Sequence, residues 1–327
     1  MNDRSLILPL LGIVGLLILV QCCWGSISIP LHRVMAALLG TGTPEDVLVV
    51  QSIRLPRALA ALLTGGALGL SGAALQGLLR NPLAEPGVLG VTAASSFGGT
   101  LIIATGLVSF IPFGIPIATI TGALLATLLL AELAYRLKSV NSLIIIGVTL
   151  SSFIGALMSL ILSLAPNPFT LGEILNWSFG SVANRSWQDI ALSLPGILFG
   201  GFLLHRARNG LRILTLGEDV AATSGLDLRR HRRLVIIGTG LATGGAVSLA
   251  GAIGFIGIIA PHAVRPWVQN DPGRTLLPSF LVGGIALMIA DLFIRLLPYL
   301  GSIRLGVAVS IVGAPLFALI AAREARS

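Results

Sequence analysis

The sequence TGGALGLSGA at residues 64–73 returns as TGGAVSLAGA at residues 243–252, with seven of ten positions identical and an offset of 179 residues. Both copies are uncharged and rich in Gly and Ala, residues that let transmembrane helices approach one another closely. Five predicted crossings separate the copies, an odd number, so equivalent segments should point in opposite directions across the bilayer. Inverted repeats of this kind are typical of transporters and place the pathway near the repeat interface. Ordinary packing of small residues is the alternative explanation for each glycine.

The composition of the chain excludes a soluble globular enzyme. Of 327 residues, 55% are hydrophobic and 10% are charged, against roughly 45–50% and about 25% in soluble domains. A helical span needs about 20 apolar residues. Ten apolar runs approach or reach that length, at about 6–24, 58–79, 88–107, 114–135, 142–165, 190–205, 234–250, 253–264, 275–297 and 305–322. We therefore expect an all-α polytopic membrane protein, a single domain over 1–327 with about ten transmembrane helices.

The run at 253–264 differs from the others. Residues 234–265 number 32, too few for two full crossings and a turn. We expect a short or irregular return that neighbouring helices shield from lipid, because unpaired backbone groups are costly in hydrocarbon.

The distribution of basic residues predicts the orientation. With the N-terminus inside, 15 of the 21 Lys and Arg residues fall in cytoplasmic segments and 6 fall outside. Cytoplasmic loops carry an excess of Lys and Arg. The split predicts that both termini lie in the cytoplasm.

The chain has a single lysine, Lys138, and it follows Leu137 rather than Gly. No Walker A sequence, G-x-x-x-x-G-K-[ST], can therefore be present. If ATP drives this protein, a separate subunit must bind it. We expect no enzyme activity and no cofactor in this chain.

The longest polar stretch, 206–233, is the expected cytoplasmic coupling segment. Thr215 or Gly217 can cap a short helix with Glu218 and Asp219 in its first turn, where negative charge is favourable, and Gly225 can end it. Such a helix can dock a partner. The alternative is a positively charged anchor that contacts only lipid headgroups.

Arginines mark the opposite membrane face. Arg54 and Arg57 flank Pro56, which predicts a kinked entry into the second span, and they can engage carboxylates of a periplasmic partner. Asp291 lies one turn before Arg295, so an ion pair between these two is the simplest explanation for this carboxylate. Asp291 is also the best candidate for a proton carrier, which would make the chain a proton-coupled secondary transporter.

Two inner turns follow the repeated sequence. Residues 81–90 hold two prolines and two glycines and predict a fixed turn, placed where a cytoplasmic gate would lie. Its counterpart is PHAVR at 261–265. His262 has no second His, Cys or carboxylate at ligand spacing, so we expect no metal site.

Several motifs together resemble the FecCD family of ABC-transporter permeases, which includes vitamin B12, ferric-siderophore and haem permeases. They are RLPR at 54–57, SGAALQ at 71–76, NPLAEPG at 81–87, GAIGFIG at 251–257, PH at 261–262 and GAP at 313–315. The resemblance covers nearly the whole chain. It implies a type II ABC importer fold with inverted halves, here 58–165 and 234–322. It also implies a second permease copy, most simply as a homodimer, two cytoplasmic ATPase subunits and a periplasmic substrate-binding protein.

The resemblance also implies roles for particular residues. Binding-protein docking falls on Arg54, Arg57 and Arg295, and one cytoplasmic gate falls on Asn81 and Leu83. A second gate falls on Val140 and Asn141, where the family's small polar pair is broken by Val140. ATPase coupling falls on Thr215, Leu216, Gly217, Glu218, Asp219, Ala221, Ser224 and Gly225. Arg304 departs from the Pro usual in relatives and adds a positive charge at the outer mouth.

The sequence thus predicts the permease subunit of an importer for an iron chelate, a ferric siderophore or haem. Import of cobalamin by the same family is the first alternative, and a proton-coupled transporter acting alone is the second. Expected contacts are the partners above and membrane lipid, with no nucleic acid.

Overall fold

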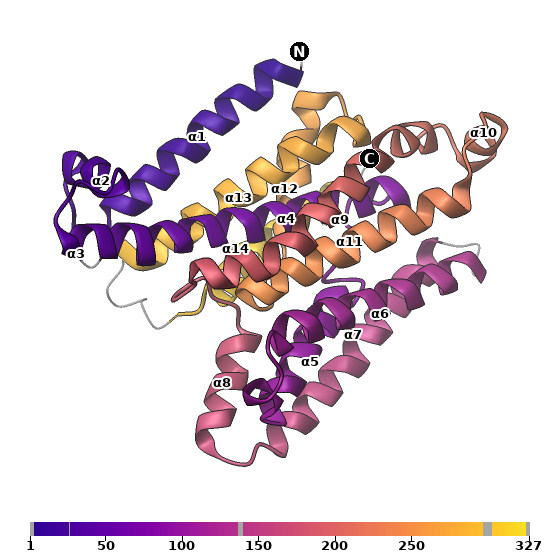
Figure 1. The fold of residues 1–327 in the computed structure, drawn as a ribbon. Coiled ribbons are helices and arrows are strands. Elements are labelled where there is room, and N and C mark those ends of the chain that lie inside the picture. Colours follow the sequence, from indigo (N-terminus) through magenta and orange to yellow (C-terminus); the bar gives the residue numbers. More distant parts are fainter. Residues whose placement is uncertain (1–2, 26, 137–139, 297–302, 325–327) are drawn as a thin grey trace.

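In a computed structural model, residues 3–25, 27–136, 140–296 and 303–324 are described, and every regular element among them is a helix (Figure 1). The helices of 14 or more residues are α1 (Asp3–Cys23), α4 (Leu55–Leu79), α5 (Val91–Ala104), α6 (Gly114–Arg136), α7 (Val140–Ser163), α9 (Trp187–Leu214), α11 (Leu228–Ala250), α13 (Pro272–Leu296) and α14 (Leu305–Glu324). The shorter elements are α2 (Leu31–Leu38), α3 (Pro44–Val47), the π-helix η1 (Leu48–Arg54), the 3-10 helix η2 (Leu107–Ser109), α8 (Pro168–Ser178), α10 (Glu218–Thr223), α12 (Ile256–Val264) and the 3-10 helix η3 (Arg265–Val268).

Each of the ten predicted apolar runs coincides with a helix. Seven helical stretches in the described chain are long and apolar enough to cross a membrane: Ser5–Cys23, Pro44–Leu79, Gly114–Leu133, Ile144–Ser163, Trp187–Leu214, Leu228–Ala250 and Pro272–Leu296. Val91–Ala104 and Leu305–Ile320 are apolar but shorter. The chain is a multi-pass membrane protein, and seven of the ten predicted spans are long enough within the described residues.

The return at 253–264 is short, as predicted. Its helix, α12, has nine residues and packs against α4, α13 and α14. Ile256 and Ile258 are buried, at 2% and 0% exposure. Protein rather than lipid therefore surrounds this helix.

The core is a seam of small residues along α4. A Cβ atom added to Gly65 would lie 2.2 Å from the carbonyl oxygen of Gly283 in α13, and one added to Gly72 would lie 1.9 Å from the carbonyl oxygen of Gly257 in α12. No side chain fits into such gaps. The glycines of the repeated sequence therefore bring three backbones into contact, and this packing holds the centre of the bundle together.

The two copies of the repeated sequence lie on adjacent helices, α4 and α11, that run in opposite directions. Gly77, near the end of α4, lies against Leu211 near the end of α9, and α10 connects α9 to the start of α11. This agrees with the direction expected of an inverted repeat, while the boundaries 58–165 and 234–322 stay a prediction. The copies differ where α11 ends at Gly251, whose φ of 73° and close approach to the Trp177 carbonyl oxygen exclude a side chain. α4 instead continues through the equivalent Gly72 to Leu79.

The predicted kink at Pro56 falls within one continuous helical stretch, residues 44–79, in which the π-helix η1 runs directly into α4. Pro56 has no N–H for the usual hydrogen bond to the carbonyl four residues earlier. The π-helical segment before Pro56 changes the hydrogen-bond spacing, so the helix continues although this hydrogen bond is missing.

The bundle has two distinct ends, visible in Figure 1. The α10 end contains α10 together with the start of α1 and the turn after α4, and Ile7 of α1 lies beside Arg212 of α9 there. The α2 end contains α2, α3, and the start of α4. Sequence reasoning did not predict α2, α3 or α8, because they are short or only weakly apolar.

Candidate functional site

The predicted coupling helix forms at the α10 end. Glu218 and Asp219 occupy the first turn of α10, and Gly217, with a φ of 103°, precedes them as the N-cap. Gly225, with a φ of 86°, follows the helix. Thr215 is not the cap: its hydroxyl donates to the Arg212 carbonyl oxygen at 2.6 Å and closes α9. The helix is therefore shorter than the predicted segment 214–226.

Side chains of this segment project outward. Leu216 and Val220 are 67% and 45% exposed, while Ala221 is buried and holds α10 to the bundle. Glu218 accepts a hydrogen bond from Arg232 of α11 at 2.6 Å. Figure 1 shows α10 at the extremity of the molecule. An exposed apolar pair beside two acidic residues suits contact with another protein better than contact with anionic headgroups.

The predicted gate turn after α4 is a fixed turn. Arg80 adopts a left-handed conformation, φ 49°, and ends α4, and the Asn81 side-chain oxygen accepts a hydrogen bond from the Leu83 N–H at 2.9 Å. Glu85 in the same turn is 6% exposed, and its Oε1 accepts a hydrogen bond from the Phe255 N–H at 3.4 Å. Burial raises the pKa of Glu85 to about 7. Sequence reasoning missed Glu85, although a glutamate between Ala84 and Pro86 was the available signal.

Gln76, in the last turn of α4, connects this helix to α12 and η3. Its Nε2 donates to the Gly257 carbonyl oxygen at 3.1 Å, and its Oε1 accepts from Arg265 Nη2 at 2.6 Å. Its carbonyl oxygen accepts from the Asn81 N–H of the gate turn at 3.2 Å. Gln76 and Arg265 border a cavity of about 310 Å³ that also touches Asn81 and Thr215. The structure thus brings a predicted gate residue and a predicted coupling residue to one space.

The second predicted gate falls at the start of α7. Val140 and Asn141 are the first two residues of this helix. Their side chains lie outside the part of the chain that the structure describes, so their role stays a prediction.

The three predicted docking arginines gather at the α2 end. Arg54, Arg57 and Arg295 all line a cavity of about 520 Å³, together with Gly25 and Asp46. The structure therefore brings together residues from the start of α4 and the end of α13.

Arg54 and Arg295 donate hydrogen bonds to backbone carbonyl oxygens of the protein itself. Arg54 is 5% exposed, and it donates to the carbonyl oxygens of Cys22 at 2.7 Å, Cys23 at 2.9 Å and Ile27. Arg295 donates to the Trp24 carbonyl oxygen at 2.6 Å. The end of α1 and the connection between α1 and α2 supply these acceptors, and sequence reasoning missed them. Gly25 belongs to this connection, and a Cβ there would lie 2.9 Å from Arg295 Nη2.

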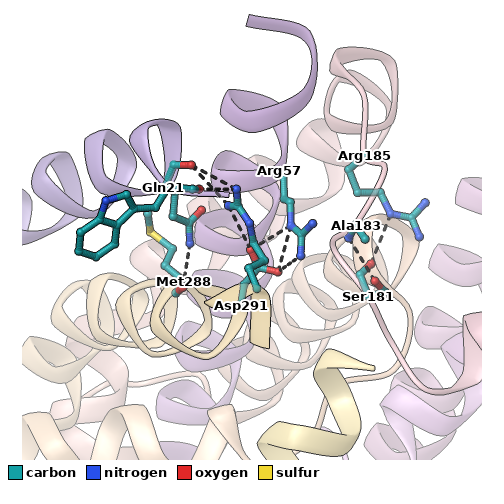
Figure 2. A network of polar contacts seen from close by, with 9 residues as sticks. Gln21, Arg57, Ser181, Ala183, Arg185, Met288 and Asp291 are labelled. Atoms are coloured by element: carbon teal, nitrogen blue, oxygen red, sulfur yellow. Dashed lines mark hydrogen bonds and ion pairs between the residues drawn. The ribbon is translucent and has the colours of Figure 1, made fainter. Parts of the chain in front are cut away.

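The predicted ion pair between Asp291 and Arg295 is present, but Asp291 has a second partner at a shorter distance. Figure 2 shows Asp291 facing Arg57, whose Nη2 lies 2.7 Å from Oδ1 and whose Nε lies 3.0 Å from Oδ2. Arg295 is 4.0 Å away. α4 packs against α13 and brings Arg57 to Asp291 in the bidentate geometry that arginine favours. Arg295, one turn from Asp291 on the same helix, does not make a bidentate contact. A carboxylate held this way is poorly placed to carry protons.

Two further arginines lie on the segments around α8. Arg304 donates a hydrogen bond from Nη2 to the Asn176 side-chain oxygen. Arg185 lies over the Trp177 ring, 5.7 Å from its centroid, and Figure 2 shows it reaching back toward Ser181. Neither contact is an ion pair. The sequence placed Arg304 at the outer mouth, but its association with α8 could not be predicted, because α8 itself was missed.

Comparison with known proteins agrees with this arrangement. The model of the FecCD transport family matches residues 13–323. The chain belongs to the FecCD transport family. It is an ABC-transporter permease, the non-catalytic membrane component, as the missing Walker A lysine had indicated.

Individual relatives of this FecCD permease cover most of its length. It is 36% identical to the "Uncharacterized ABC transporter permease protein YvrB" of Bacillus subtilis (strain 168), over 96% of this chain and 91% of that protein. It is 38% identical to the vitamin B12 import system permease protein BtuC of Salmonella typhi, over 85% of each. A solved structure of an ABC transporter assigned to the metal-chelate type, in an inward-facing conformation, matches with a TM-score of 0.86 and 30% identity, over 98% of this chain and 99% of that one.

Proposed function

We propose that this FecCD permease is the membrane subunit of a bacterial importer for an iron chelate, a ferric siderophore or haem. A periplasmic binding protein delivers the chelate at the α2 end, and two ATPase subunits dock at the α10 end. Two permease copies form the pathway in the inner membrane, with both termini in the cytoplasm. The observation that carries the proposal is the cavity shared by Asn81 and Thr215.

That cavity offers a short mechanical route from ATPase to gate. Movement of α10 shifts Thr215, which ends α9, and Thr215 borders the same space as the turn containing Asn81. Gln76 and Arg265 connect this turn to α12 and η3. ATP binding to a partner could thereby displace the gate turn while α4 and α13 stay packed. This chain performs no covalent chemistry in the cycle.

One arginine supports an anionic cargo. Arg304 precedes α14, and its side chain contacts that of Asn176 in α8, which is uncharged. This partner therefore does not cancel the positive charge of Arg304. Iron chelates with carboxylate groups, including haem with its propionates, are attracted by such a mouth.

Cobalamin is the second candidate, favoured by the 38% identity to a permease named for vitamin B12 import. The two cargoes can be separated by uptake into vesicles that contain the permease, its ATPase and its binding protein. We expect ATP-dependent uptake of a ferric chelate or haem, and Arg304→Gln should lower it while leaving any cobalamin uptake unchanged. Uptake of cobalamin alone would replace the iron chelate with the second candidate.

The coupling role is tested in the same vesicles by Glu218→Ala. We expect uptake and permease-stimulated ATP hydrolysis to fall about tenfold, which corresponds to about 1.4 kcal/mol. Glu132→Ala is the matched control, because Glu132 is also an exposed glutamate paired with an arginine, Arg136 at 2.9 Å. Uptake that needs neither ATP nor a partner, but follows a proton gradient, would overturn the proposal.

A further inference from the structure

A second cavity at the α10 end takes no part in the proposed transport cycle. It measures about 270 Å³ and lies between α1, α9 and α13. Its lining divides into a polar, basic group and an apolar group. The lining residues are Ile7, His205, Arg208, Asn209, Arg212, Gly273, Arg274, Leu276, Leu277 and Pro278.

The basic group follows one face of α9. His205, Arg208 and Arg212 are spaced at i, i+3 and i+7, so their side chains share a stripe along the last turns of the helix. Arg212 Nε lies 2.8 Å from Asp271 Oδ2, which fixes this side chain against the start of α13. Arg274 adds a further positive charge from the first turn of α13. Asp271 thus pairs with Arg212 at the polar side of the cavity.

The apolar group continues the cavity toward the membrane interior. α13 begins at Pro272 at this end, so Leu276 and Leu277 lie about 3–4.5 Å deeper along the helix than Arg274. Leu277 is 48% exposed. Ile7 belongs to α1, of which only 17% is buried in the molecule, so this side of the cavity faces lipid.

We propose that this cavity binds one anionic phospholipid. Its phosphate lies among Arg208, Arg212 and Arg274, and one acyl chain follows Leu277 and Ile7 into the bilayer. Basic pockets between transmembrane helices on the cytoplasmic side suit acidic headgroups. A free phosphate would use only the basic half of the cavity, whereas a lipid uses both halves.

The test measures retention of lipid by the full-length chain in detergent, using native mass spectrometry. We expect phosphatidylglycerol to be retained in preference to phosphatidylcholine. Arg208→Gln should weaken phosphatidylglycerol binding about fivefold, the effect of one arginine near an acidic lipid surface. Arg206→Gln is the matched control, because Arg206 is exposed on the same turn but does not line the cavity. Equal weakening in both variants would mean general attraction to headgroups and would overturn the site.

Two further arms complete the test. Millimolar inorganic phosphate should not displace phosphatidylglycerol, and displacement would identify a phosphate site instead of a lipid site. If Arg208→Gln does not fold, Leu277→Trp tests the apolar half, since an exposed position tolerates the larger ring. We expect this variant to fold and to lose most of the retained phosphatidylglycerol, and full retention would contradict the proposal.

Discussion

The two ends of the bundle hold arginine in opposite ways. At the α2 end, Arg54 and Arg295 are buried against backbone carbonyls. At the α10 end, Arg206 and Arg208 are exposed on α9. The α1–α2 connection covers the first pair, and no such cover lies over the second in the described chain. One residue type therefore holds the fold together at one end and stays available for contact with lipid or protein at the other.

The largest effect on stability should come from Asp291→Asn. This side chain is 2% exposed and pairs with Arg57, so the substitution leaves a partly buried arginine without its carboxylate. Removing one partner of a buried pair costs about 3–5 kcal/mol. The free energy of unfolding, measured by titration with SDS, should fall by this amount. Glu132→Asn, at an exposed pair, should change it by less than about 1 kcal/mol, and equal losses would remove the contrast between the ends.

Arg54→Gln should be the next most destabilising change. It removes a charged donor from three carbonyl oxygens, two at the end of α1 and one in the α1–α2 connection. A hydrogen bond to a charged group contributes about 1.5–3 kcal/mol, so a loss of about 3–4 kcal/mol is expected after partial compensation by the shorter amide. Arg206→Gln, on the exposed side of α9, is the control in the same unfolding experiment. A change of similar size in the control would show that burial does not distinguish these arginines.

At the α10 end, the acidic side chain of Glu85 is buried, unlike those of the exposed arginines Arg206 and Arg208. The pKa of its carboxyl is about 7 in the folded chain and 4.5 in the unfolded chain. Between these values the folded chain keeps the proton and the unfolded chain has lost it. The free energy of unfolding should therefore fall as pH rises from about 4.5 to 7, by on the order of 3 kcal/mol, and then level off. In Glu85→Gln this slope should disappear; a parallel pH profile in both proteins would show that Glu85 is not its source.

The sequence was sufficient for the parts of the fold that depend on local pattern. Apolar runs located the ten helices, and the Pro and Gly content of 81–90 predicted a fixed turn. Arg57 and Asp291 are 234 residues apart, however, and their pairing depends on how α4 packs against α13. Ile27, whose carbonyl oxygen contacts Arg54, carries no side-chain signal for that role. Contacts made by backbone groups across the bundle could not be predicted, because almost any residue can supply a carbonyl.

The smallest effect on stability should come from Glu218→Gln. This substitution separates residues that stabilise the fold, such as Asp291, from residues that contact another subunit. The Glu218 side chain is 43% exposed and its ion pair with Arg232 reaches solvent. Exposed pairs contribute about 0.2–1 kcal/mol, so the free energy of unfolding should stay within about 0.5 kcal/mol of the starting protein. A coupling residue should nevertheless lose ATP-driven uptake in vesicles, because its contact is with another subunit. Unchanged uptake with unchanged stability would leave α10 as a surface helix, and a large loss of stability would make Glu218 a structural residue like Asp291.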